Sequence, residues 1–343
     1  MPNRLILSAP PYLKTGETNH CLMFDVYIAC LPVILASLYF NGPRVILVLF
    51  LSVFSAMATE AIIQMLKAPG YTFRPFLYNF LTNEKITLAD GSALVTGLLL
   101  AFNLPPQVPF WIPIVGSSVA IAVGKQIFGG LGYNIFNPAL FARAFLLAAW
   151  PVHMTHWVTP FDWGRWWGQF SPAAFSSWAI DAVSTATPLT LMKMEGTATP
   201  YWNLFIGQIG GCTGETSALA LLIGAAYLLY KGTITWHIPF CYLGTVAVLT
   251  TLLGRDPIFH LFSGGLMLGA FYMATDVVTS PVTKKGRLIF GIGCGLITVM
   301  IRRYGAFPEG VSYSILLMNA CTPMLDRYTG GVPQRFRTMG RTP

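Results

Sequence analysis

Ten mostly apolar segments constrain the fold of this chain more than any other feature of its sequence. They lie at 21–40, 44–66, 91–103, 110–128, 136–150, 207–230, 236–253, 258–275, 287–301 and 311–324. A helix needs about 20 apolar residues to cross the hydrocarbon core of a bilayer, and the third and last segments are short or interrupted. Because 54% of the 343 residues are hydrophobic and only 10% are charged, an ordinary soluble domain is excluded. The sequence predicts an all-α integral membrane protein with about ten transmembrane helices.

The distribution of positive charge predicts the orientation of these helices. With a cytoplasmic N-terminus, 14 of the 21 basic residues lie inside, Lys125 among them, six lie outside, including Arg302, and Arg143 lies within a span. An inside excess of Lys and Arg is the usual bias of membrane proteins. Both termini are therefore expected in the cytoplasm, as a segment at 1–20 and a basic tail at 326–343, and the loop at 151–206 is expected in the periplasm. Anionic lipid headgroups account for the net charge of +8, so no nucleic acid is implied.

The chain divides into two halves of five apolar segments, at 21–150 and 207–325. At one offset, the stretch 92–109 aligns with 264–281, which matches Leu94 with Leu266, Gly97 with Gly269 and Pro109 with Pro281. Halves with an odd number of spans insert with opposite topology, and inverted repeats with broken helices mark a binding or transport pathway. Chance similarity between apolar segments is the alternative explanation of these matches.

An octapeptide in the long loop, Asp181 to Pro188, places small hydroxylated residues beside an acid. Its pattern, Asp-x-x-Ser-x-Ala-Thr, resembles the acceptor signature at which a flavin transferase esterifies the phosphate of FMN to the last threonine, here Thr187. Asp181, Ser184 and Ala186 would then form the motif that the transferase recognises. The alternative is structural: such a Ser/Thr-rich stretch is also typical of a turn or the start of a helix, with Ser or Asp as the cap and Pro188 fixing the backbone.

Two glycine-rich runs are further candidate sites. One lies at 129–139, and the other contains Gly211, Gly214, Glu215, Thr216 and Ser217. Neither matches a Walker A or Rossmann fingerprint, so nucleotide binding is not indicated. Glycine permits close backbone approach, and the polar residues of the second run can cap the helix that follows. These runs are therefore either near a cofactor or tight turns between helices.

Metal and iron–sulfur centres are not expected in this chain. Its six cysteines form no Cys-x-x-Cys pair, and most of them lie in apolar segments, where a free thiol acts as a small hydrophobic group. His153 and His156 have a ligand-like spacing, but hydrogen-bonded histidines are the default in such a loop. We therefore expect no metal ligands.

Ionisable residues within the apolar segments are costly in hydrocarbon and indicate function by default. The sequence has such residues at Asp25, Glu60, Arg143 and Glu215. An ion path through Asp25, Glu60 and Arg143 is one interpretation. In the other, Asp25 and Glu60 meet headgroups at the cytoplasmic ends of their helices, Arg143 pairs with a carboxylate, and the ion-coupling groups lie in partner subunits.

The octapeptide, the two glycine runs and the ten-segment plan together resemble the family of D subunits of the bacterial Rnf electron-transport complex, which is similar to the B subunit of the sodium-translocating NADH:quinone oxidoreductase. The resemblance covers nearly the whole chain. It implies a urea-transporter-like fold of two inverted five-helix repeats in the inner membrane and a covalent FMN on Thr187. One departure is Thr185, a conceivable rival acceptor, where the family often has Gly.

The resemblance also implies partners and an activity. It implies a complex that couples electron transfer between ferredoxin and NAD to Na⁺ or H⁺ translocation, with other membrane subunits, a periplasmic flavin-bearing subunit and cytoplasmic iron–sulfur subunits. A flavin transferase would be needed for maturation, and a non-covalent flavin such as riboflavin is a further candidate cofactor. The inverted repeat alone also fits another class of protein, a stand-alone channel or transporter for a small polar solute.

Overall fold

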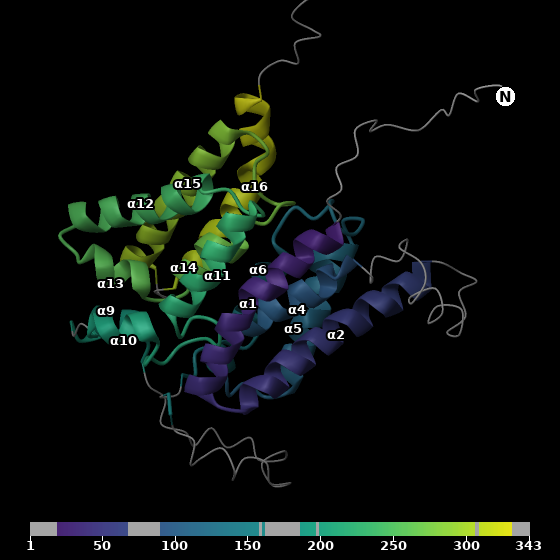
Figure 1. The fold of residues 1–343 in the computed structure, drawn as a ribbon, viewed down its shortest axis with the longest axis horizontal. Helices are drawn as coiled ribbons and strands as arrows, with labels where there is room; N and C mark the ends of the chain where they lie inside the picture. Colours follow the sequence, from purple (N-terminus) through teal and green to yellow (C-terminus); the bar gives the residue numbers. More distant parts are fainter. Residues whose placement is uncertain are drawn as a thin grey trace, which may run out of the picture.

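A computed structural model describes residues 19–67, 90–157, 160–161, 186–196, 199–305 and 309–330. Within these ranges the regular structure is entirely helical (Figure 1). A helix lies in each of the ten predicted apolar segments, although several begin later or are shorter than predicted. The predicted all-helical class is therefore confirmed for the described part of the chain.

The first half contains two long helices followed by shorter ones. These are α1 (Asn19–Asn41), α2 (Arg44–Lys67), α4 (Ser92–Phe102), α5 (Trp111–Ile121), its π-helical continuation η2 (Ala122–Gln126) and α6 (Pro138–Ala149). The short helix α7 (Pro151–Met154) follows at the start of the loop. Asn137 caps α6, because its side-chain oxygen accepts from the N–H groups of Ala139 and Leu140, while Pro138 occupies the first turn. The second part of the 129–139 run is thus a helix start.

The second half is more broken than its sequence suggests. It contains α11 (Ala218–Lys231), α12 (His237–Leu252), α13 (Pro257–Phe262), α14 (Leu266–Leu268), the π-helix η5 (Gly269–Met273), α15 (Lys284–Tyr304) and α16 (Val311–Thr329). Two short helices, α9 (Pro188–Met194) and α10 (Tyr201–Ile206), lie before it in the loop at 151–206. The segment predicted at 258–275 is not one continuous helix, since Ser263 to Gly265 interrupt it. The segment predicted at 207–230 becomes regular only at Ala218, after the cap residue Ser217.

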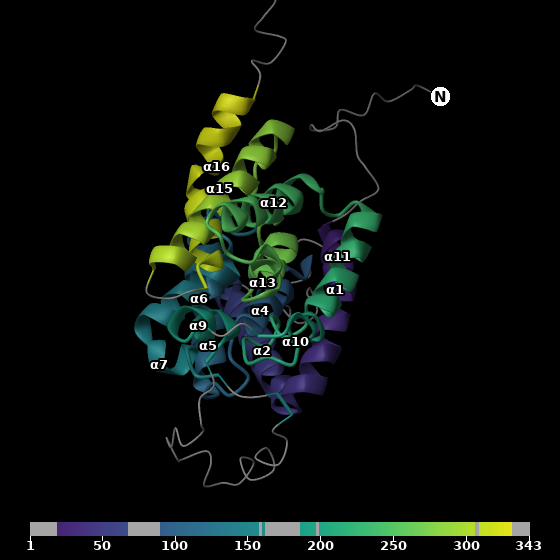
Figure 2. The same ribbon diagram turned by 90° about the vertical axis from the view of Figure 1, so that its left-hand side faces the viewer.

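The two halves pack against each other and share one hydrophobic core. In the first half α2 packs against α4 and α5, in the second α12 packs against α15, and α1 lies beside α11 across the division (Figures 1 and 2). A hydroxyl pair bridges helices in each half: Ser52 with Ser117 at 2.8 Å, and Tyr242 with Thr298 at 2.7 Å. Hydrogen bonds of this kind hold helices together where apolar contact alone gives no preference for protein over lipid.

Helices α1 and α2 are long and apolar enough to cross a membrane, with a mean hydropathy of 2.2 in their best windows. Only 22% and 33% of those windows are buried. Large apolar side chains on both helices are exposed, and they are Phe24, Leu31, Leu35, Tyr39, Ile46, Phe50, Phe54, Ile62 and Leu66. An exposed surface of this composition is typical of contact with lipid or with another membrane protein.

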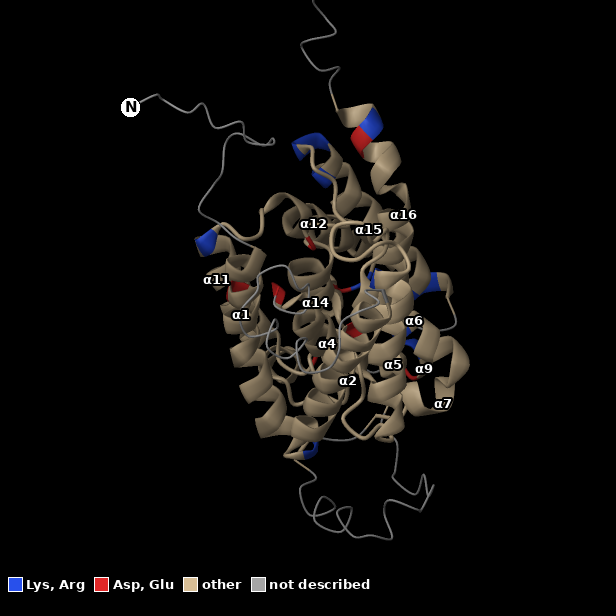
Figure 3. Cartoon of the chain, turned by 90° about the vertical axis from the view of Figure 1, so that its right-hand side faces the viewer, with Lys and Arg blue, Asp and Glu red and all other residues tan. Residues whose placement is uncertain are grey.

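Helix α16 ends at the top of the molecule in Figures 1 and 2, and α1 begins at its own upper end, nearer the middle of the molecule. Figure 3 shows basic residues on the last turn of α11, the first turn of α15 and the last turn of α16, and a few charged residues inside the bundle. The buried charges form the candidate site.

Candidate functional site

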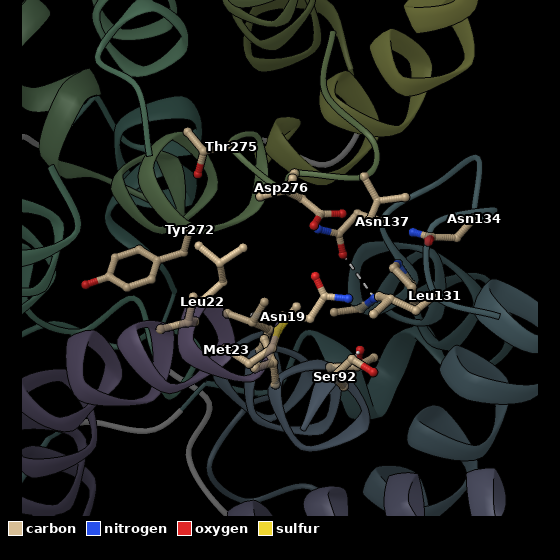
Figure 4. Close-up of a pocket in the computed structure, with 18 of the residues that line it drawn as sticks. Asn19, Leu22, Met23, Ser92, Leu131, Asn134, Asn137, Tyr272, Thr275 and Asp276 are labelled. Atoms are coloured by element: carbon tan, nitrogen blue, oxygen red, sulfur yellow. Dashed lines mark hydrogen bonds between the residues drawn. The ribbon is translucent and has the colours of Figure 1, made fainter. Parts of the chain in front are cut away.

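A cavity of about 390 Å³ lies between the two halves. Its walls come from α1, α4, η2, the glycine run before α6, the end of α11, and η5 with the residues that follow it. Figure 4 shows Asn19, Asn137 and Asp276 projecting into this space from three of these elements. Apolar side chains such as Leu99 and Phe271 complete the lining. The first glycine run therefore belongs to a cavity wall as well as to a turn.

A buried ion pair supports one side of the cavity. Lys125 on η2 donates to the two carboxylate oxygens of Glu60 at 2.7 and 3.0 Å and to the hydroxyl of Ser92 at 2.7 Å. Gln126 donates to the same carboxylate at 3.1 Å. The side chains of Lys125 and Glu60 are 2% and 0% exposed. The alternative that Glu60 meets lipid headgroups was wrong, because its carboxylate is buried against Lys125.

Two aspartates beside the cavity lie in environments that favour the protonated form. Burial raises the pKa of Asp276, and hydrogen bonds from Thr279 and from backbone N–H groups oppose the rise. Burial also raises the pKa of Asp90, and the charge of Lys125 opposes it. The cavity can therefore offer both carboxyl and amide groups to a bound molecule.

A series of polar contacts leads from the cavity into the interior. Asn137, which lines the cavity, donates to the carbonyl oxygen of Met273 at 3.3 Å. Asn103 donates to the sulfur of the same methionine at 3.5 Å and accepts from Arg143 at 2.7 Å. Asn137, Asn103 and Arg143 belong to the first half, and Met273 belongs to the second. We call this series, from Asn137 to Arg143, the polar seam.

Arg143 binds two carboxylates of the second half. Its guanidinium donates to Glu215 at 3.0 Å and forms a second ion pair with Glu309. The predicted pairing of Arg143 with a carboxylate is confirmed. The thiol of Cys212 completes the group by donating to the Asn103 carbonyl at 3.3 Å.

A metal-like ligand set is present here, but it is already occupied by a cationic side chain. Ligand atoms of Cys212, Glu215 and Glu309 lie within 4.8 Å of one another. Because the Arg143 guanidinium pairs with both carboxylates, it supplies the positive charge that a metal ion would otherwise bring.

The second glycine run packs against the end of α4. The N–H groups of Thr213 and Gly214 donate to the carbonyls of Leu104 and Phe102 at 3.0 and 2.9 Å. A Cβ atom on Gly214 would lie 2.4 Å from the Cβ of Phe102, so this position requires glycine. The second run is therefore a site of close backbone packing, as its glycines predicted.

The other members of this run have separate roles. Ser217 caps α11, as predicted, whereas Glu215 turns inward to Arg143. Thr216 is buried, and its hydroxyl donates to the Thr213 carbonyl at 3.5 Å. A Cβ atom added to Gly211 would have the Glu215 side chain, at 4.0 Å, as its nearest neighbour. Glu215 is therefore the member of the run that reaches the charged group.

Thr187 caps α9. Its hydroxyl oxygen accepts from the N–H of Thr190 at 3.3 Å and lies 2.9 Å from the Thr190 hydroxyl, and the side chain is buried. The predicted helix start is therefore confirmed, with Thr187 and not a Ser or Asp as the cap, and a cap is compatible with a second role as an acceptor. Ala186 is described just before it, whereas Asp181, Ser184 and Thr185 lie outside the described residues.

A small apolar cluster, separate from the main core, holds α9 in place. It contains Leu189, Leu204, Ile209 and Phe259. A Cβ on Gly264 would lie 2.6 Å from a methyl group of Leu189, so α9 rests on the break between α13 and α14. Thr187 is thus attached, through its own helix, to the interrupted segment of the second half.

The structure does not bring the three predicted ion-path residues into mutual contact. Asp25 on α1 accepts from the hydroxyls of Tyr227 at 2.9 Å and Thr233 at 3.3 Å. Glu60 pairs with Lys125, and Arg143 pairs with Glu215 and Glu309. Each of the three therefore has local partners of its own.

Arg302 is a buried cation that the sequence pattern had placed outside. It is 5% exposed and donates to the carbonyls of His260 at 2.6 Å, Ser263 at 2.9 Å and Gly264 at 3.3 Å. Its position corresponds to that of Lys125. Each of the two cations lies in the last turn of its helix, just before a connection. Lys125 contacts the start of the short helix α4, and Arg302 contacts the start of the short helix α14. The sequence signal for Arg302 was a charged residue at the edge of an apolar segment. At such a position the sequence does not distinguish a side chain that snorkels to the membrane surface from one that is buried.

Buried charges paired across two helical halves, together with apolar exposed helices, define a membrane protein with a polar interior and not a soluble helical domain. Residues 6–336 match the NQR2, RnfD, RnfE family. The chain therefore belongs to this family of membrane proteins, as the sequence resemblance predicted.

Individual relatives match over almost their entire lengths. The chain is 49% identical over 330 residues to the D subunit of the Na⁺-translocating ferredoxin:NAD⁺ oxidoreductase complex of Acetobacterium woodii, covering 95% of this chain and 93% of the relative. It is 38% identical to the D subunit of the proton-translocating ferredoxin:NAD⁺ oxidoreductase complex of Clostridium ljungdahlii, with 98% and 97% covered. The D subunit of the ion-translocating oxidoreductase complex of Stutzerimonas stutzeri is 41% identical, with 89% of each chain covered.

Proposed function

We propose that this chain is the D subunit of an ion-translocating ferredoxin:NAD⁺ oxidoreductase complex and carries FMN on Thr187. The observation that carries the proposal is the 49% identity to the Acetobacterium woodii relative over 95% of this chain. The acceptor motif ending at Thr187 supports the flavin. Electron flow between ferredoxin and NAD would then be coupled to movement of Na⁺ or H⁺, and relatives named for each ion leave both open.

The surroundings of Thr187 fit an esterified threonine. Esterification removes the hydroxyl proton, so the oxygen can only accept, and both the N–H and the hydroxyl of Thr190 are placed to donate to it. The side chain is 5% exposed, so a transferase must act before α9 docks or while it is displaced. Once attached, FMN would supply one- and two-electron chemistry that side chains cannot perform.

The cavity fits the proposed second, non-covalent flavin such as riboflavin. Its volume of about 390 Å³ falls in the range of small-molecule sites, roughly 300–1,000 Å³. Apolar walls suit a flat aromatic ring system, and Asn19, Asn137 and Asp276 offer hydrogen-bonding groups of both kinds. The glycine run at 211–217 lies in the Arg143 region and would not contact this ligand directly.

We further propose ten transmembrane helices in two inverted five-helix repeats with a urea-transporter-like fold. The repeats would occupy 21–150 and 207–325, flanked by cytoplasmic segments at 1–20 and 326–343. Two observations support the repeat. The aligned helices α4 and α14–η5 are both short, and a buried cation, Lys125 or Arg302, contacts the start of each. Such broken helices are usual at the midplane of transporters built from inverted repeats.

The proposed location is the bacterial inner membrane, with both termini cytoplasmic and 151–206 periplasmic. Helix α1 begins and α16 ends at the upper end of each helix in Figure 1, which supports this, as do the basic residues on that side, Lys231, Lys284, Lys285, Arg287 and Arg327. The partners would be other membrane subunits, a periplasmic flavin-bearing subunit, cytoplasmic iron–sulfur subunits and a flavin transferase.

Single cysteines on opposite sides test this sidedness. In a background without native cysteines, Met194→Cys on α9 is expected to react with an impermeant maleimide in sealed right-side-out vesicles, and Tyr328→Cys on α16 is expected to be protected. Both parent side chains are about four-fifths exposed, at 82% and 80%, so access to the reagent depends on sidedness and not on burial. Labelling of the Tyr328→Cys protein in sealed vesicles would reverse the proposed orientation.

The competing function is a stand-alone channel or transporter for a small polar solute, which the cavity between two halves would also suit. Covalent flavin separates the two. When the chain is produced together with a flavin transferase, denatured and run on a gel, we expect a fluorescent band under ultraviolet light. A non-fluorescent band from a host with demonstrated transferase activity would favour the solute transporter.

A further inference from the structure

The charge balance around Arg143 is unusual for a buried site. One guanidinium contacts two carboxylates, Glu215 and Glu309, and the described residues place no second cation in salt-bridge contact with either. The next cation, Arg302, is bound to backbone carbonyls instead. Arg302 therefore offsets the second carboxylate only at longer range, without a salt bridge. A carboxylate with no cation of its own is costly in a low-dielectric interior, so this group is stabilised when one carboxyl takes up a proton or another small cation.

Access distinguishes the two carboxylates. The side chain of Glu215 is 4% exposed and faces Gly265, where a Cβ would lie 2.4 Å from its carboxylate oxygen. The side chain of Glu309 is 22% exposed and lies in the connection between α15 and α16, next to the start of α16. Exchange with the surroundings is therefore easier at Glu309 than at Glu215.

The same group is linked to the cavity. From Arg143 the polar seam runs through Asn103 and Met273 to Asn137, which lines the cavity. Much of the rest of the interface between the halves is apolar, and the polar contacts of Asp25 with Tyr227 and Thr233 lie apart from the seam. In the proposed topology the cavity lies toward the cytoplasm and the α15–α16 connection toward the outside, so the seam and Glu309 together connect the two sides.

We propose that Glu309 is the ion-exchanging carboxyl at the outer end of the polar seam, alternating between its pair with Arg143 and a form that holds a proton or Na⁺. The proposal rests on the proposed function, because it makes Glu309 a residue of ion translocation. When Glu309 takes the ion, Arg143 keeps Glu215 as its partner, so neither the guanidinium nor the carboxylate that remains is left unpaired.

The electrostatic surroundings of Glu309 agree with this role. Burial raises the pKa of Glu309, the charge of Glu215 raises it further, and Arg143 and Arg302 lower it. Cys212 is the other titratable group of the cluster. A folded-state pKa above the value of about 4.3 in the unfolded chain means that the folded protein binds more protons in that interval.

The first test measures ion binding without electron transfer. The melting temperature of the full-length chain in detergent is followed from pH 5 to pH 9, with and without Na⁺, for the natural protein, Glu309→Gln and Glu309→Asp. Because the folded state holds the extra proton, the natural protein is expected to lose stability relative to Glu309→Gln as pH rises, and Glu309→Asp is expected to keep this dependence. A Na⁺-dependent gain at high pH that Glu309→Gln lacks would identify Na⁺ as the occupant.

The second test measures coupling in the intact complex in inverted membrane vesicles. Electron transfer from ferredoxin to NAD and ion uptake are recorded together for Glu309→Gln and for the matched control Glu195→Gln, an exposed glutamate just after α9. The number of ions taken up per electron is expected to fall about fivefold or more in Glu309→Gln and to stay unchanged in Glu195→Gln. A factor of about five is the lower end of typical coupling between two sites. Electron transfer is expected to continue.

The outcomes separate the two proposals. If the natural complex shows no ferredoxin-driven uptake, the proposed function fails, and the melting experiment still decides whether Glu309 binds an ion. If the difference between the natural protein and Glu309→Gln is independent of both pH and Na⁺, Glu309 exchanges no ion and the proposal is overturned. Unchanged uptake per electron in Glu309→Gln overturns it as well.

Discussion

Replacing Thr187 by alanine is expected to abolish covalent flavin attachment completely. The substitution removes the one hydroxyl at the last position of the acceptor motif, and alanine offers no atom that can form the phosphoester. The same change removes the cap of α9, because the Thr187 oxygen accepts from Thr190. Loss of a cap costs about 1 kcal/mol, which is too little to unfold the chain. The measurement is in-gel fluorescence of the denatured protein combined with peptide mass spectrometry.

Two comparisons make this result specific. Thr187→Ser keeps both a hydroxyl and a helix cap, so it is expected to retain the fold and to report how strictly the transferase requires threonine. Thr185→Ala removes the neighbouring hydroxyl and is expected to leave the flavin in place. Flavin found on Thr185 in the natural protein would show that the attachment site has been assigned to the wrong threonine.

Replacing Lys125 by methionine is expected to destabilise the protein by about 3–5 kcal/mol, the usual effect of breaking a buried ion pair. The change leaves the fully buried Glu60 without its cation and removes the hydrogen bond to Ser92 at the start of α4. The measurement is the free energy of unfolding in mixed micelles as denaturing detergent is added. Binding of a flavin to the adjacent cavity is expected to weaken in parallel.

The double variant Lys125→Met, Glu60→Gln is the matched control. It removes the buried negative charge together with the positive one, so a large part of the lost stability is expected to return, because a neutral amide is far less costly to bury than a carboxylate. Gln126 remains beside position 60 and can still donate to the amide oxygen. A double variant as unstable as Lys125→Met would show that the charge of Glu60 is not the cause.

Apolar segment length predicted the helical class and most helix positions, because hydrophobic burial and lipid contact select the same residues. Segment length did not locate the break at 258–275, where the small residues Ser263 to Gly265 interrupt the helix and Arg302, distant in sequence, donates to the carbonyls of Ser263 and Gly264. Hydropathy predicts whether side chains are buried or exposed. It does not predict which groups satisfy the backbone N–H and C=O groups, and so it does not locate a helix break.

The candidate site was only partly predictable for a related reason. Arg143 and Glu215 were identified because a charge within an apolar segment is conspicuous, and the expected pairing of Arg143 was found. Glu309 was missed because it lies between two helices, where an acidic residue looks like an ordinary loop residue. Lys125 was assigned to a flank because a lysine at a segment end resembles a topology signal. In both cases the partner lies far away in the sequence, and pairing between distant residues cannot be inferred from local composition.

The cavity has walls from Asn19 at the start of α1 to Val278 after η5. During synthesis, its last wall emerges only after most of the chain has been made, and neither half encloses the space alone. A ligand of this cavity must therefore be loaded after translation is nearly finished, and separately produced halves would bind it only if they reassociate. Maturation of this protein would then have an order, in which assembly of the two halves precedes loading of the cavity.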